Sequence, residues 1–132
     1  MRYLGIDYGR VRIGIARSDE EGTMAFPDRV IAVGTEAVAA EEIAKIARDA
    51  GAGAVVMGLP LALDGAETEE SRRARSFAEM TRIATGLPVY LENEIFTSRM
   101  ADHAGVAKDK IDAASAAIIL QSYLDRKIKD KG

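Results

Sequence analysis

The sequence predicts an α/β domain with a mixed five-stranded sheet flanked by helices, in which three antiparallel strands come first. One observation is the order of the patterns, which reads β-β-β-α-β-α-β-α along the chain. A second is that helical patterns alternate with the later strands, which predicts parallel pairing through crossovers. A third is residues 54–60, a run without charge or alternation that is typical of a strand covered on both faces. With 132 residues, we expect a single domain over 1–132.

The N-terminal third contains the antiparallel part of the sheet. Apolar residues at 3–6 and 13–16 predict two strands joined by a tight turn, in which we expect Gly9 to take a positive φ. Asp7 stands where the first strand ends. Residues 24–33 predict a third strand, and Pro27 favours an edge position because proline cannot donate to a ladder.

The remaining elements follow from spacing and caps. Thr35 is the predicted N-cap of a helix that Gly51-Ala52-Gly53 ends, and a second helix follows a predicted mobile loop at 61–70 and closes near Gly86. Residues 87–91 predict the fifth strand, which 92–94 terminate. Residues 97–104 predict a short helix and 111–124 a last helix, followed by a charged tail that we expect to fray.

Composition restricts the class of protein. The chain has no cysteine, which excludes disulfides and thiolate metal sites and suits a reducing cytosol. It shows no signal peptide and no apolar run of about 20 residues, so we expect a cytoplasmic protein without a membrane span. The net charge of −3 does not indicate a nucleic-acid binder by itself, but local clustering matters more than the sum.

Three acids fall at the ends of predicted elements: Asp7, Glu94 and Asp112. Sites in open α/β sheets form beyond the carboxyl ends of strands, so Asp7 and Glu94 can face one crevice. Asp112 begins a helix whose next residues, 113–124, carry no charge, so it is the one ionised member of an inward face. The alternatives are a turn aspartate at position 7 and an acid favoured by the helix dipole at position 112.

A cluster of these three carboxylates would need cations. At ~4 Å and an effective dielectric of about 20, each pair repels by roughly 4 kcal/mol. Oxygen ligands without cysteine, and a single histidine, favour Mg²⁺ or Mn²⁺ over zinc. Two such ions ~3.5–4 Å apart can clamp the attacking and leaving oxygens of a phosphodiester, so we expect two ions.

Four segments of the chain match linked motifs. Residues 5–16 resemble G-(L/I)-D-x-G-x-x-R-(I/V)-G-(V/I)-A, and residues 56–61 with Asp64-Gly65 resemble V-V-G-L-P-x-x-x-D-G. Residues 93–98 resemble D-E-R-L-T-T, and residues 111–121 resemble I-D-x-x-A-A-x-x-I-L-Q. These four motifs span nearly the whole chain in order, and together they resemble those of the YqgF/RuvX family. The chain departs from the family at Asn93, where the motif has Asp, and at Ile95, where it has Arg.

This resemblance implies an RNase H-like fold and a metal-dependent endonuclease that hydrolyses phosphodiesters in structured nucleic acid. The family is described as Holliday junction resolvases and as a nuclease that matures the 5′ end of pre-16S rRNA. Carried over, Asp7, Glu94 and Asp112 would be the catalytic, metal-binding acids. The implied partner is pre-rRNA or branched DNA, and symmetric cutting of a four-way junction would call for a homodimer.

Basic side chains near these motifs are candidates for nucleic-acid contacts, because arginine forks suit phosphate oxygens. They are Arg10 and Arg12 at the first hairpin, Arg72 and Arg73 at the start of the second helix, and Lys110 before Asp112. For those at helix starts, a purely solvated role is the alternative.

Two other functions compete with a nuclease. One is a non-catalytic RNase H-like module that binds nucleic acid and uses the acids structurally. The other is an ATP-binding phosphotransferase of the sugar-kinase and actin type, whose opening also reads Asp-x-Gly. That class needs two such domains facing a cleft, which 132 residues cannot supply.

Overall fold

The computed structural model describes residues 1–93 and 108–131, with side chains in the last helix described for 112–129. Within these ranges the five predicted strands form one sheet in the order β3-β2-β1-β4-β5. The elements are β1 (Arg2–Asp7), β2 (Arg12–Ser18), β3 (Ala25–Ala32), α1 (Glu36–Ala50), β4 (Ala52–Leu59), α2 (Glu69–Thr85), β5 (Val89–Asn93) and α4 (Lys108–Lys131).

The strand directions confirm the predicted mixed sheet. β1 pairs with β2, and β2 with β3, in antiparallel directions. β1 and β4, and β4 and β5, pair in parallel. The strand with Pro27 lies at an edge of the sheet, as predicted, and β1 occupies the centre, so the carboxyl end of β1 has neighbours on both sides.

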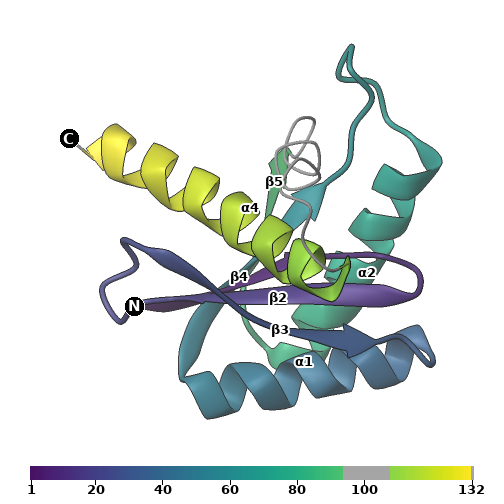
Figure 1. Ribbon diagram of the computed structural model, residues 1–132, viewed down its shortest axis with the longest axis horizontal. Helices are drawn as coiled ribbons and strands as arrows, with labels where there is room; N and C mark the ends of the chain where they lie inside the picture. The colour runs from purple at the N-terminus through teal and green to yellow at the C-terminus, as the bar shows by residue number, and fades with distance from the viewer. Residues whose placement is uncertain (94–107, 132) are drawn as a thin grey trace.

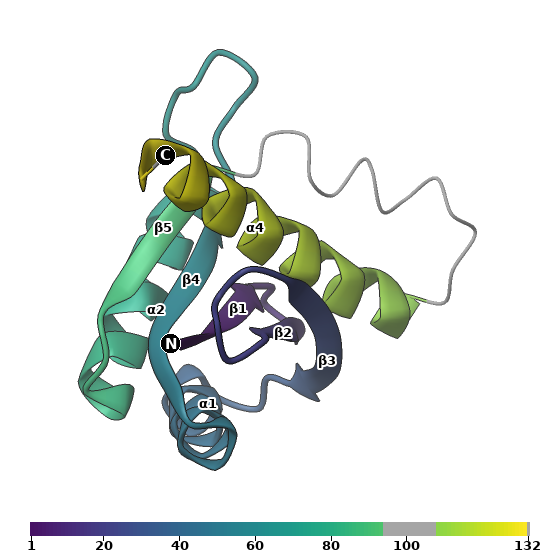
Figure 2. The same cartoon turned by 90° about the vertical axis from the view of Figure 1, so that its left-hand side faces the viewer.

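The sheet is the middle layer of three. Helices α1 and α2 cover one face, and α4 lies across the other (Figures 1 and 2). Alternate side chains of each strand divide between the two layers. Leu4, Ile6 and Phe77 belong to the core shared with α1 and α2, whereas Tyr3 and Leu120 belong to the core under α4.

Local sequence explains the two helices on the first face. The Thr35 side chain accepts a hydrogen bond from the Val38 amide at 3.2 Å, and Gly51 ends α1 with a φ of 68°. Thr68 and Ser71 form a reciprocal capping box at the start of α2. The predicted caps of α1 are therefore confirmed, and α2 begins within the segment predicted as loop.

Close contact with α4 depends on two glycines. A Cβ built on Gly5 would lie 2.8 Å from the Leu120 Cβ, and one built on Gly14 would lie 1.9 Å from the Asp112 carbonyl oxygen. Side chains at either position would therefore push the helix off the sheet. The antiparallel register places Gly5 opposite Ala16, so small residues line the path of α4 over β1 and β2.

Several predictions of detail are wrong. Gly9 has no positive φ; it is glycine because a Cβ there would lie 2.5 Å from the Arg12 carbonyl oxygen. β5 begins at Val89 and includes Glu92 and Asn93 rather than ending before them. The charged tail expected to fray continues α4 to Lys131, since its side chains find partners on the sheet.

The segment 61–70 has local order. The Ala62 amide donates to the Ala66 carbonyl at 3.0 Å, and the Gly65 amide donates to the Ala62 carbonyl at 2.8 Å. Its mobility stays a prediction. The helix predicted for 97–104 lies outside the described residues, as does Glu94. In the part of the chain that the structure describes, no helix has the length and apolar character that a membrane span requires.

Candidate functional site

Asp7 lies at the carboxyl end of the central strand, on the face that α4 covers. Tyr3 and Gly5 contact α4 residues, and the period of two along β1 assigns Asp7 to the same face. The side chain is partly exposed at this end of the sheet. The predicted position of Asp7 at a strand end is thus confirmed. This end of the strand lies near the beginning of α4.

Asp112 is brought to the same place by the close contact at Gly14. Gly14 is the β2 partner of Asp7 in the antiparallel register. The backbone of Asp112, in α4, lies directly over Gly14. A side chain on Gly14 would occupy the space of the Asp112 carbonyl group. Two acids more than 100 positions apart in the sequence therefore flank one glycine.

Arg12 contacts the second of these acids. Its Nε donates to Asp112 Oδ2 at 2.8 Å, and the two side chains are 33% and 25% exposed. Because Arg12 and Gly14 are two positions apart in β2, their side chains belong to the same face of the sheet. The guanidinium therefore provides positive charge at the edge of the pair formed by Asp7 and Asp112.

The third predicted acid, Glu94, lies outside the described residues, immediately after β5. Among the described residues there is no group of three His, Cys, Asp or Glu side chains that could hold a metal ion. Of the three predicted acids, the described residues include Asp7 and Asp112, and both lie next to Gly14.

Glu92, which the sequence analysis treated only as part of the end of the fifth strand, contributes to packing. It is 4% exposed and faces α4, where its Oε2 accepts a hydrogen bond from the Ser122 hydroxyl at 2.9 Å. Its Oε1 lies 2.6 Å from Arg126 Nη2, in an ion pair without hydrogen-bond geometry. Glu92 thus ties the edge strand to α4. The only advance signal was that strand alternation puts Glu92 on the side predicted for Glu94.

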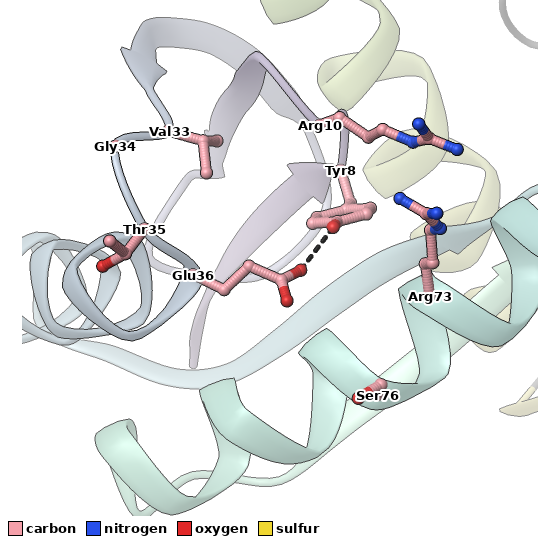
Figure 3. Close-up of a pocket in the computed structure, with 8 residues that line it drawn as sticks. All are labelled: Tyr8, Arg10, Val33, Gly34, Thr35, Glu36, Arg73 and Ser76. Atoms are coloured by element: carbon pink, nitrogen blue, oxygen red, sulfur yellow. Dashed lines mark hydrogen bonds between the residues drawn. The ribbon is translucent and has the colours of Figure 1, made fainter.

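The predicted basic residues divide between the two faces of the sheet. Arg12 lies with the acids, whereas Arg10 and Arg73 line a cleft of about 370 Å³ on the α1 and α2 face (Figure 3). Arg72 is exposed at the start of α2 and does not line this cleft. Lys110 lies in the first turn of α4, and its side chain is outside the described part of the chain.

Tyr8 and Glu36 form the floor of this cleft. The Tyr8 ring stacks on Phe77, with ring centroids 4.8 Å apart, and its hydroxyl donates to Glu36 Oε2. Burial, followed by the hydrogen bond to Glu36, raises the pKa of Tyr8 to about 12. The Tyr8 hydroxyl therefore keeps its proton and donates it in the hydrogen bond to Glu36. Sequence reasoning missed both residues, since neither carries a motif signal.

Solved structures define the class of this fold. RuvC from T. thermophilus, in complex with a Holliday junction substrate, superposes with a TM-score of 0.63 at 15% identity, covering 97% of this chain and 96% of that one. The fowlpox virus resolvase with its Holliday junction DNA gives 0.57 at 10% identity, covering 97% and 99%. The fold is that of the RuvC-like resolvases, an RNase H-like fold.

Sequence comparison then gives the family. The model described as "RuvX: Holliday junction resolvase" matches residues 1–126, and the chain belongs to this family. Relatives from Nitratidesulfovibrio vulgaris and Anaeromyxobacter sp. are each 41% identical over 133 residues, covering 95% of this chain and 94% and 97% of theirs. Both carry the name "Putative pre-16S rRNA nuclease". Membership implies a nuclease, a hydrolase acting on phosphodiester bonds.

Proposed function

We propose that this protein is a metal-dependent endonuclease that cuts structured nucleic acid at a site formed by Asp7, Asp112 and Glu94. The observation that carries the proposal is that both acids lie next to Gly14, Asp7 as its partner in the sheet and Asp112 on the helix that covers it. Glu92, two positions before Glu94, faces α4, which is the side that sequence alternation assigns to Glu94.

The donor set fits a divalent cation. Nucleases and resolvases of this family generally use divalent metal ions. Carboxylate oxygens suit Mg²⁺ or Mn²⁺, and we propose two ions because a pair can contact both the attacking and the leaving oxygen. Such ions, when bound, would supply the charge that stabilises the attacking and leaving oxygens of a phosphodiester. The role of the chain is to hold the acids at a fixed spacing, which Gly14 does by letting α4 approach β2.

The basic side chains are proposed to bind the phosphate backbone. Arg12 lies beside Asp112 and can contact a phosphate next to the one being cut. Arg10 and Arg73 line the cleft beside the end of β1, Arg72 is exposed at the start of α2, and Lys110 precedes Asp112 in α4. They provide guanidinium and ammonium donors for phosphate oxygens on a chain whose net charge is −3.

The names of the relatives favour pre-16S rRNA as a substrate, and the family description favours a Holliday junction. Processing one RNA end requires one site, whereas symmetric cutting of a four-way junction requires two. We therefore propose that action on a junction involves a homodimer. Because precursor rRNA is processed in the cytoplasm of bacteria, we also propose a cytoplasmic location.

A cleavage panel with Mg²⁺ or Mn²⁺ tests the proposal. It compares a four-way DNA junction, plain duplex DNA and an RNA that carries the 5′ leader of 16S rRNA. We expect cleavage of a structured substrate by the wild type, and a loss of at least about 100-fold in Asp7→Asn, because changes even to groups around metal ligands cost 10–100-fold. Asp49→Asn, on the exposed face of α1, is the matched control and should cleave normally.

The stability of the Asp7→Asn variant completes this test. Without metal its melting temperature should equal or exceed that of the wild type, because one of the repelling carboxylates is gone. An unfolded variant, or one with full activity, would remove Asp7 from the site.

The ion pair between Arg12 and Asp112 favours one alternative, a non-catalytic module that binds nucleic acid. In that case Asp112 has a structural partner and needs no metal. A wild-type protein that binds the junction or the RNA leader, but cleaves neither with Mg²⁺ nor with Mn²⁺, would establish this alternative.

A further inference from the structure

The cleft between the first hairpin, the start of α1 and α2 has a composition that the cleavage site does not explain. It lies on the face of the sheet opposite Asp112, yet Tyr8 at its floor directly follows Asp7. Consecutive Cα atoms are about 3.8 Å apart, so the cleft and the proposed cleavage site meet at one end of β1. Its volume of about 370 Å³ falls at the small end of ligand sites.

Two guanidinium groups converge at one end of the cleft. Arg73 Nη2 lies 2.8 Å from Glu69 Oε1, and Arg10 Nη2 lies 3.9 Å from the same oxygen. Both arginines line the cleft together with Tyr8 (Figure 3). Each guanidinium has five N–H donors, and an exposed pair with Glu69 is easily exchanged for a phosphate oxygen.

The middle of the cleft presents an acceptor instead. The Glu36 carboxylate points into it, with Oε2 bonded to the Tyr8 hydroxyl (Figure 3). Within residues 1–93 and the described part of α4, its Oε1 accepts no hydrogen bond. A carboxylate at this position repels a lone phosphate and attracts an N–H donor. The cleft therefore suits a ligand with an anionic end and an N–H edge.

We propose that this cleft binds one nucleotide, with its phosphate on Arg10 and Arg73 and the N–H edge of its base on Glu36. This inference rests on the proposed function for the identity of the strand that supplies the nucleotide. A strand held at Asp7 continues around the end of β1 into the cleft, where an unpaired base can leave the stack. Reading the hydrogen-bonding edge of an unpaired base is a common mode of RNA recognition.

Binding to a fluorescein-labelled single-stranded RNA hexamer, measured by anisotropy in EDTA, tests the phosphate half. We expect Arg73→Gln to weaken binding about tenfold, as for the loss of a charge-assisted hydrogen bond, and to lower the salt slope by about one. Arg82→Gln, at the other end of α2 and paired with Glu79, is the matched control and should bind as the wild type. Equal loss in the two variants would overturn the assignment of the phosphate to the cleft.

A comparison of guanosine monophosphate and inorganic phosphate, by amide chemical shifts of Gly34 and Ser76, tests the base half. The wild type should prefer the nucleotide. Glu36→Gln should weaken nucleotide binding and leave phosphate binding equal or tighter, whereas Glu41→Gln on the exposed side of α1 should change neither. A Glu36→Gln variant that keeps the preference for the nucleotide would overturn the proposal.

The same measurements distinguish a nucleic-acid strand from a free nucleotide, and they test nucleotide binding in the cleft separately from cleavage. A hexamer that binds more tightly than the monophosphate identifies a strand, and equal affinities identify a free nucleotide. If the wild type cleaves none of the substrates but Arg73→Gln and Glu36→Gln weaken binding as expected, the proposed nuclease function is wrong and the nucleotide site is supported. If the wild type cleaves but neither substitution changes binding, the nuclease function is supported and the nucleotide site is wrong.

Discussion

Arg12 places a permanent cation on an acid that we propose as a metal ligand. Its Nε occupies a position 2.8 Å from Asp112 Oδ2, in a pair that is partly exposed to water. A guanidinium and a divalent ion compete for the same carboxylate, because each lowers the attraction left for the other. The ion pair can therefore stabilise Asp112 beside Asp7 in the absence of metal, and it can separate when metal and substrate bind.

Arg12→Gln should tighten Mg²⁺ binding about two- to fivefold, the range expected when a competing, partly exposed ion pair is removed. The measurement is calorimetric titration of the free protein with MgCl₂. Arg17→Gln, whose partner is Asp28 near the sheet edge, is the control and should not change the affinity. Weaker Mg²⁺ binding in Arg12→Gln would instead mean that Arg12 orients Asp112 for the metal.

For single residues, the sequence predicts the chemistry of the side chains better than their contacts. Asp7 and Asp112 are recognisable because acids interrupt apolar patterns. The partner of Asp112 is 100 positions away, and nothing local in the sequence connects Arg12 to it. Glu36 and Tyr8 escape prediction for the same reason, because their hydrogen bond joins a helix start to a strand end.

Among the elements, the contact of α4 with β2 at Gly14 controls the site. The helix begins over the strand where the strand has no side chain, so the acid on the helix reaches the level of Asp7. Any increase in this spacing separates the two acids.

Gly14→Ala should lower stability by about 3 kcal/mol and reduce cleavage further than the folded fraction explains. The reason is that the added methyl group would lie 1.9 Å from the Asp112 carbonyl, a backbone atom that cannot rotate away. Urea unfolding gives the stability. Gly34→Ala is the control: its Cβ meets nothing within 4 Å and its φ is not positive, so it should be neutral or slightly stabilising. Similar stability for the two variants would contradict the role of Gly14.

The C-terminal half of α4 gives a second prediction, since it is tied to both β1 and β5. Arg126 pairs with Glu92, and Lys127 donates to the Tyr3 hydroxyl. A chain that ends at Leu124 should melt several degrees lower than the full chain, because it leaves the Glu92 carboxylate buried without its cation. A chain that ends at Ile128 keeps both contacts and should melt within about two degrees of the full chain. Equal melting of the two truncated chains would support a frayed tail.

This half of α4 shows why the end of a helix is hard to predict. Residues 125–131 are charged and have no apolar period, which is also the pattern of a solvated tail. Their helical structure depends on partners in two strands, Glu92 and Tyr3. By contrast, α1 was predictable at both ends because Thr35 and Gly51 act within one turn.

For the whole molecule, the metal is expected to affect stability without being required for folding. Among residues 1–93 and 112–129, the two cores on either face of the sheet consist of apolar side chains and include neither Asp7 nor Asp112. EDTA should therefore abolish cleavage and leave the far-UV circular dichroism unchanged. Mg²⁺ at ten times its dissociation constant should stabilise the protein by about 1.4 kcal/mol, a rise of a few degrees in Tm.

The Asp7→Asn variant is the control for this linkage, and its Tm should respond little to Mg²⁺. Unfolding of the wild type by EDTA would mean that the ion is structural. A Tm that rises equally in both proteins would place the bound ion elsewhere.

The sequence is most informative about the fold of the whole molecule. Chain order and hydrophobic periods predict the number of strands and their parallel and antiparallel pairing, and Pro27 marks an edge. The motifs predict the family, which the comparisons confirm. What the patterns do not contain is how closely α4 approaches the sheet, because this depends on the absence of side chains at Gly5 and Gly14.

The position of α4 at the end of the chain also has a consequence for synthesis. Translation delivers the N-terminus first, at about 5–20 residues per second, so the strand with Asp7 leaves the ribosome several seconds before the helix with Asp112. Until then β1 and β2 expose the apolar face that α4 will cover, and the two acids cannot meet. If Asp7 and Asp112 form the proposed cleavage site, a growing chain cannot yet cut nucleic acid, and a prematurely terminated chain would be released with an incomplete sheet whose apolar face is exposed.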